Sequence, residues 1–93
     1  LRGNSDADEF MRKYLGVLID DEHNAVLLST LLSLVDNNWN IRKTAGALSL
    51  HYNTMKYRCG KISDILGIDI AISEDRLNIM VAAKLYRLSL HRR

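Results

Sequence analysis

A short helical segment and a longer amphipathic one follow each other between Asn40 and Gly67, with room for only a brief turn between them. Asn40 is a preferred N-cap residue, and the pattern after it predicts a helix over 41–48. A second helix is predicted over 52–66, where Gly67 can adopt the left-handed conformation that ends a helix. Two helices joined by three or four residues, the first only two turns long, form a helix-turn-helix. We therefore predict such a unit over 40–67.

The predicted helix over 52–66 has one apolar and one polar face. At about 100° per residue, four side chains fall within roughly 60° and form the predicted buried face: Met55, Cys59, Ile62 and Leu66. The opposite face holds Asn53, Tyr57 and Gly60, flanked by Lys56 and Lys61. Without a side chain, Gly60 either permits close approach of this helix face to a groove, or is tolerated there at a cost to helix stability of up to about 1 kcal/mol relative to alanine.

The rest of the chain predicts three further helices, over 6–15, 21–37 and 74–90, with a loop over 68–73. Gly16 is expected to end the first helix, Asp20 to cap the second and Ser73 to cap the last. The expected core positions are Leu27, Leu28, Leu31, Leu34 and Val35 in the second helix, and Leu77, Met80, Val81, Leu85 and Leu88 in the last. The 93 residues contain no proline. We therefore expect an all-α fold, a five-helix bundle in one domain over 1–93.

Charge is unevenly distributed along the chain. Residues 1–36 carry seven acidic and three basic side chains, whereas residues 37–63 carry no acid and five bases: Arg42, Lys43, Lys56, Arg58 and Lys61. A stretch with only positive charge is typical of a surface that binds a phosphate backbone. The alternative is a solvated face that is positive by chance.

Several side chains of the predicted unit suit contacts with double-stranded DNA. On a helix in the major groove, Asn53 can reach adenine and Lys56 can reach guanine. Thr54, in the first turn, can offer its hydroxyl and backbone N–H to a phosphate. Tyr52 and Tyr57 can hydrogen-bond phosphates or pack on a thymine methyl group.

The remaining candidates lie around these residues. Arg42 and Lys43 open the helix that crosses the DNA backbone in this geometry. His51 is expected to cap the following helix or bind a phosphate. Arg58 points sideways, either to a phosphate or to an acid such as Asp36. Cys59 is expected to serve packing rather than redox chemistry.

The run from Asn40 to Gly67 resembles the C-terminal helix-turn-helix domain of the PucR/CdaR family of bacterial transcriptional regulators. The family pattern is close to N-I-S-x-T-A-x-x-L-x-[IV]-H-R-N-T-[LV]-x-Y-R-L-x-[KR]-I-x-x-[IL]-[LT]-G, and its core H-x-N-T-x-x-Y-R is met from His51 to Arg58. The resemblance extends from Asp20 into the last helix. The chain is more distantly similar to the Fis-type helix-turn-helix.

The resemblance implies a sequence-specific DNA-binding domain at the end of a regulator whose upstream part senses a metabolite. By position, the implied DNA contacts are Asn40, Arg42, His51, Tyr52, Thr54, Lys56 and Tyr57. Three residues depart from the pattern. Tyr52 replaces an arginine, Cys59 a core leucine, and Gly60 a polar or basic residue.

Other functional classes find less support in the sequence. The single cysteine and the three separated histidines predict neither a disulfide nor a metal site. No nucleophile–base pair, phosphate loop or cofactor motif predicts an enzyme, and no apolar run is long enough for a membrane helix. Because the chain begins at Leu1 rather than at methionine, we expect it to be a fragment of a longer, cytoplasmic protein. We expect the upstream region of that protein to bind an effector, and the full-length protein to form homodimers or higher oligomers. The alternative function is a helical protein–protein interaction or dimerisation module, which would use the acidic first half or the last helix.

Overall fold

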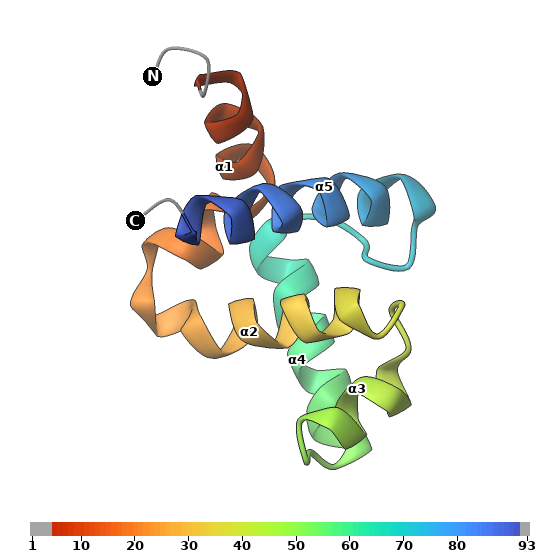
Figure 1. Ribbon diagram of the computed structural model, residues 1–93. Helices are drawn as coiled ribbons and strands as arrows, with labels where there is room; N and C mark the ends of the chain where they lie inside the picture. Colours follow the sequence, from red (N-terminus) through yellow and green to blue (C-terminus); the bar gives the residue numbers. More distant parts are fainter. Residues whose placement is uncertain (1–4, 92–93) are drawn as a thin grey trace.

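The structure is a computed structural model that describes residues 5–91. Its elements are α1 (Ser5–Asp20), a 3-10 turn η2 (Glu22–Asn24), α2 (Ala25–Asp36), α3 (Ile41–Ala47), α4 (Tyr52–Leu66) and α5 (Ser73–Leu90). The five α-helices confirm the predicted all-α class, and residues 5–91 contain no strand. In Figure 1, α2 and α4 cross near the middle, α5 runs above α2 in the view, and α3 lies beside α4 at the end far from α1.

The core is built where four of the long helices meet. Each helix contributes side chains that are less than a tenth exposed: Leu15 and Leu18 from α1, Leu28, Leu31 and Leu34 from α2, Met55, Cys59 and Ile62 from α4, and Ile79, Ala82 and Ala83 from α5. Ala45 of α3 joins the same cluster. The predicted core of the second helix is therefore confirmed at Leu28, Leu31 and Leu34, while Leu27 and Val35 are half-buried against it.

The first helix was predicted to end at Gly16, but α1 continues to Asp20. Leu15 and Leu18 are both fully buried, and only an uninterrupted helix turns both side chains toward the core. Burial of these two leucines outweighs the modest cost of a glycine within a helix. Gly16 is thus an interior helix residue.

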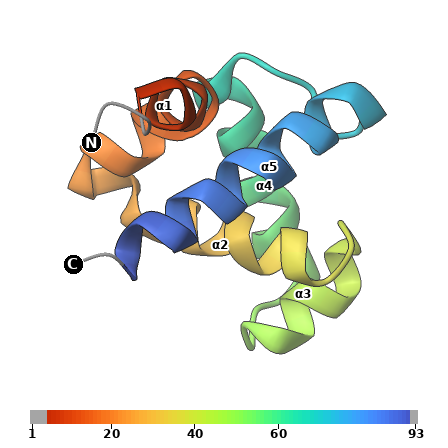
Figure 2. The ribbon, with the colours of Figure 1, turned by 45° about the horizontal axis from the view of Figure 1, so that its top comes forward.

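The second predicted helix is divided near its start. Asp21, not Asp20, is the N-cap, and its carboxylate accepts a hydrogen bond from the backbone N–H of His23 at 2.9 Å. This cap opens the 3-10 turn η2, and α2 begins only at Ala25. The turn reorients the chain between α1 and α2, which Figure 2 shows with α1 viewed nearly end-on.

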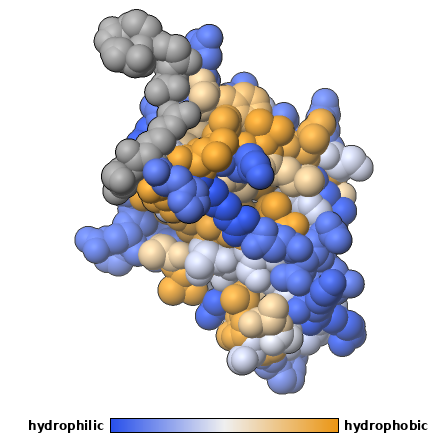
Figure 3. Space-filling view, in the orientation of Figure 1, coloured by the Kyte–Doolittle hydropathy of each residue, from blue (hydrophilic) through white to orange (hydrophobic). Residues whose placement is uncertain are grey.

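The last helix begins at Ser73, so the predicted Ser73 cap was wrong by one residue: Ile72 is the N-cap and makes no side-chain capping hydrogen bond. Its predicted core face was also wrong. Leu77, Met80, Val81 and Leu88 are exposed, and Leu85 is half-buried. The helix has apolar residues on two opposite sides, and the side that carries Ile79, Ala82 and Ala83 is the buried one. Figure 3 shows apolar surface along α5, interrupted by hydrophilic side chains.

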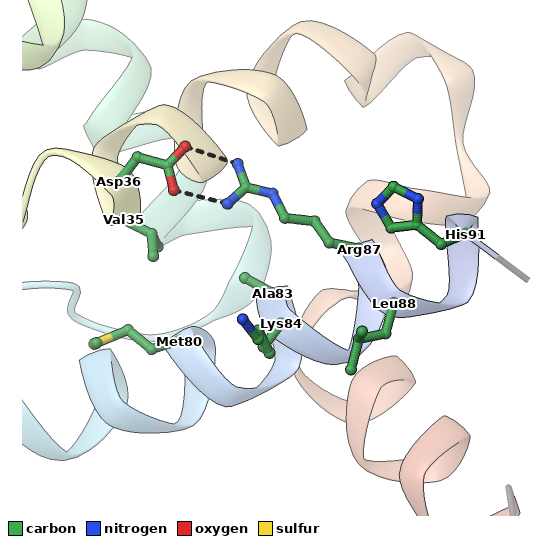
Figure 4. Close-up of a pocket in the computed structure, with 8 residues that line it drawn as sticks. All are labelled: Val35, Asp36, Met80, Ala83, Lys84, Arg87, Leu88 and His91. Atoms are coloured by element: carbon green, nitrogen blue, oxygen red, sulfur yellow. Dashed lines mark hydrogen bonds and ion pairs between the residues drawn. The ribbon is translucent and has the colours of Figure 1, made fainter.

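A groove lies between the end of α2 and the second half of α5 (Figure 4). Asp36 and Arg87 pair across one side of it. Its remaining lining residues are Val35, Met80, Ala83, Lys84, Leu88 and His91. The groove shows that α5 leaves part of its outer surface uncovered by the described residues.

Candidate nucleic-acid interface

The predicted helix-turn-helix is confirmed, with α3 packed against α4. Thr44 and Ala45 are buried where the two helices meet, and Ala45 is only 4% exposed. The backbone N–H of Leu50 donates to the carbonyl of Ala45 at 2.8 Å, which closes the turn. Ser49 within the turn has a φ of 56°, in the left-handed region. These contacts fix the angle between α3 and α4.

Both helices of the unit begin at capped residues. The side chain of Asn40 accepts from the backbone N–H of Lys43 at 2.8 Å, as predicted. The ring Nδ1 of His51 accepts from the backbone N–H of Asn53 at 3.1 Å. His51 is therefore a helix cap, one of its two predicted roles, and its ring is in the tautomer that carries hydrogen on Nε2.

The two faces of α4 are as the sequence predicted. Met55, Cys59 and Ile62 are buried, and Leu66 is half-buried. The outward face exposes Asn53, Lys56, Gly60 and Lys61, and Tyr57 is 67% exposed. Asp64 is also exposed, one turn beyond Gly60. Since a carboxylate repels phosphate, Asp64 marks the end of the surface suited to DNA.

The Tyr52 ring contacts two cations where α3 meets the start of α4. The guanidinium carbon of Arg42 lies 4.1 Å from the centroid of the Tyr52 ring, and the Nζ atom of Lys56 lies 5.6 Å from it. The contact with Lys56 is one helical turn away, a spacing that the sequence could have revealed. The contact with Arg42 joins two helices, so only the folded structure shows it.

Arg58 does not pair with Asp36, the acid named as one of its two predicted partners. Its Nη1 atom donates to the hydroxyl of Thr30 at 3.0 Å. Thr30 is fully buried in α2 and donates in turn to the carbonyl of Val26 at 2.7 Å. The expected acid, Asp36, instead pairs with Arg87. Arg58 therefore ties α4 to α2, a structural role that the sequence pattern did not indicate.

All the predicted site residues lie on the α3–turn–α4 unit. Tyr52 is half-buried, and the others are exposed: Asn40, Arg42, Lys43, His51, Asn53, Thr54, Lys56, Tyr57 and Lys61. In the region that the structure describes, no cluster of three or more His, Cys, Asp or Glu side chains could hold a metal ion. None of the helices within residues 5–91 is long and apolar enough to cross a membrane. Burial raises the pKa of the Cys59 thiol, which suits a packing role.

Comparison with known proteins gives one family and several relatives. Residues 27–85 match the family model described as the PucR C-terminal helix-turn-helix domain. The chain is 36% identical over 85 residues to the Carbohydrate diacid regulator of Escherichia coli (strain K12), and this match covers 91% of the chain and 22% of that protein. It is 36% identical over 75 residues to the Transcriptional activator PmfR of Paenarthrobacter nicotinovorans, covering 80% of the chain and 16% of that protein.

A third relative is the DNA-binding transcriptional activator AdeR of Bacillus subtilis (strain 168), 28% identical over 71 residues, or 76% of the chain and 17% of that protein. The chain thus spans less than a quarter of the length of these relatives. No solved structure matches the chain significantly. The family match covers more than half of the chain and includes the whole α3–turn–α4 unit, so the chain belongs to the family of the PucR C-terminal helix-turn-helix domain.

Proposed function

We propose that the chain is a sequence-specific DNA-binding domain of a bacterial transcriptional regulator, with α4 as the helix that enters the major groove. The observation that carries the proposal is the outward face of α4, which is polar, basic and exposed on a well-fixed helix-turn-helix corner. The family match and the names of the relatives support DNA binding in the regulation of transcription.

Residues on α4 supply the base contacts in this proposal. Asn53 and Lys56 are exposed in its first two turns, at the end of the helix that lies beside α3. Asn53 donates to and accepts from an adenine edge, and Lys56 donates to guanine. Tyr57 packs on a thymine methyl group or donates its hydroxyl to a phosphate. Lys61, a turn farther along, binds the backbone.

Residues at the helix starts supply the phosphate contacts. The first turn of α4 carries no acid, so its backbone N–H groups and the hydroxyl of Thr54 face an anion without competition from a carboxylate. Arg42 and Lys43 extend this positive surface from α3. His51 contributes its Nε2–H. The Oδ1 atom of Asn40 caps α3, which leaves its amide Nδ2 to donate to a phosphate.

We further propose that residues 1–93 form a single domain without a catalytic role. In the complete regulator, which works in the bacterial cytoplasm where its DNA lies, another region binds the effector. Homodimers or higher oligomers would place two such domains on half-sites one turn of DNA apart.

A second function is favoured by one observation, the exposed apolar side chains of α5. Leu77 is 62% exposed, and Met80, Val81 and Leu88 lie on the same side of the helix. An apolar stripe of this kind is typical of a helix that contacts another protein or a second copy. A helical interaction or dimerisation module is therefore the alternative, and its sign would be a stable protein complex formed without DNA.

The test is DNA binding by the 93-residue chain. Duplexes selected from a random pool would be titrated between 50 and 200 mM salt, conditions under which about five phosphate contacts give a log–log slope of about −4 to −5. Lys56→Ala and Tyr57→Ala should each weaken binding to the selected duplex. Arg12→Ala is the control, since Arg12 lies on α1 and pairs with Asp8 and Asp20. A flat salt dependence, or no binding below about 100 μM at low salt, would contradict the proposal.

A further inference from the structure

The Tyr52 ring is close to two cations that come from different helices. Arg42 is on the first turn of α3, Tyr52 is the first residue of α4, and Lys56 lies one turn farther along α4. The Arg42 guanidinium is 4.1 Å from the ring centroid and the Lys56 ammonium is 5.6 Å from it. Both distances are within the range of attraction between a cation and an aromatic face.

Neither cation forms an ion pair with an acid among the described residues. Within residues 5–91, the ion pairs involve Arg12, His23 and Arg87, and none includes Arg42 or Lys56. An aromatic ring attracts a guanidinium without competing for its N–H donors, because those donors lie in the plane of the group and point away from the ring. The charge of Arg42 is therefore held in place but stays available to an anion.

We propose that Tyr52 is a positioning residue that orients Arg42 toward a phosphate of the DNA backbone while it holds Lys56 toward the groove. This inference rests on the proposed DNA-binding function. A long exposed arginine samples many rotamers, and ordering it on the ring before DNA arrives lowers the entropic cost of the contact. In this arrangement the Tyr52 ring acts through the two cations, and its hydroxyl has no part in binding.

The role of the ring is separated from that of the hydroxyl by two substitutions. Tyr52→Phe keeps the ring, so affinity for the selected duplex should change less than about twofold. Tyr52→Leu removes the aromatic face and should weaken binding about twofold to fivefold, the range of an exposed cation–aromatic contact. If Tyr52→Phe weakens binding as much as Tyr52→Leu, the hydroxyl contacts DNA and the inference is overturned.

The coupling to Arg42 is tested by a double-mutant cycle. In an Arg42→Ala background, Tyr52→Leu should cost less than about half of its fold-effect in the parent, because the cation that it positions is gone. Arg42→Ala should also reduce the salt slope by about 1, as expected for one lost phosphate contact. An equal effect of Tyr52→Leu in both backgrounds would overturn the inference. Circular dichroism melting of each variant checks that the fold is kept.

A measurement without DNA separates this inference from the proposed function. In the free chain, the ring current of Tyr52 should move the NMR signals of the Arg42 side-chain protons upfield, in the parent and in Tyr52→Phe but not in Tyr52→Leu. Absence of this shift would overturn the positioning role even if the chain binds DNA. If the shift is present and no duplex is bound at low salt, the DNA-binding proposal fails and the phosphate role of Arg42 fails with it.

Discussion

Asp36 and Arg87 join the end of α2 to the last turns of α5 through a two-point ion pair (Figure 4). Arg87 Nη1 donates to Asp36 Oδ1 at 2.7 Å, and Nη2 donates to Oδ2 at 2.8 Å. The side-chain hydrogen bond from Arg87 lowers the pKa of Asp36 below its ordinary value, and the same bond raises the pKa of Arg87. Both side chains are more than a third exposed, so solvent screens the pair.

Arg87→Met should lower the free energy of unfolding at pH 7 by about 0.5–1 kcal/mol, as expected for an exposed but bidentate pair. Because the folded-state pKa of Asp36 is lowered, the contribution is present above the ordinary value of 3.8 and is lost as pH falls through the folded-state value. Urea unfolding of both chains at pH 7 and at successively lower pH measures the difference. In an Asp36→Asn background, Arg87→Met should no longer change the free energy of unfolding at pH 7. If the parent and Arg87→Met still differ at low pH, the difference does not come from the Asp36–Arg87 ion pair.

Thr30→Val should destabilise the chain by about 1–3 kcal/mol. Valine has nearly the same shape but removes the fully buried hydroxyl oxygen that accepts from Arg58 Nη1 at 3.0 Å. Ser29→Ala is a matched control, because the Ser29 hydroxyl donates to the same Val26 carbonyl at 3.0 Å but is exposed. Urea unfolding should show a large effect for Thr30 and little for Ser29. Equal effects would mean that Arg58 gains nothing from the Thr30 hydroxyl.

The helix-turn-helix could be predicted closely from the sequence because its boundaries depend on local chemistry. Asn40 and Gly67 act through their own side chain and backbone, and α4 runs from 52 to 66 as expected. Gly16 shows where local chemistry misleads. The same residue type that ends α4 lies inside α1, because burial of Leu15 and Leu18 favours a continuous helix there. Tertiary packing, which the local pattern does not contain, decides between the two.

The face that α5 buries could not be predicted from the size of its apolar residues. The large side chains Leu77 and Met80 predicted one side, but the side that is buried carries Ala82 and Ala83. The cluster of Arg42, Tyr52 and Lys56 was missed for a similar reason. Each residue was a DNA-contact candidate by itself, and their mutual contact depends on how α3 meets α4.

Cys59 should react slowly with a thiol reagent such as Ellman's reagent while the chain is folded. The side chain is 7% exposed, and burial raises its pKa, so little of the reactive thiolate forms at pH 8. We expect reaction at least about tenfold slower than in urea, because it requires local opening. Because the folded-state pKa of Cys59 is raised, the stability gained by burying its neutral thiol is complete below the ordinary pKa of 9.0 and falls at higher pH. Equal rates in buffer and in urea would show that Cys59 is accessible.

Gly60→Ala should stabilise the free chain and weaken its binding to DNA. A Cβ atom added at Gly60 would meet nothing within 4 Å, so alanine should raise the free energy of unfolding by up to about 1 kcal/mol through helix propensity. On the outward face of α4, the same methyl group would separate the helix from the groove, and we expect affinity for the selected duplex to fall about threefold or more. Gly16→Ala is the matched control: it lies within α1, its Cβ would meet Arg12 Cβ at 3.6 Å, an ordinary contact, and it should stabilise the chain without changing affinity. If Gly60→Ala also leaves affinity unchanged, Gly60 is a tolerated weak spot, and the groove does not approach α4 closely at that turn.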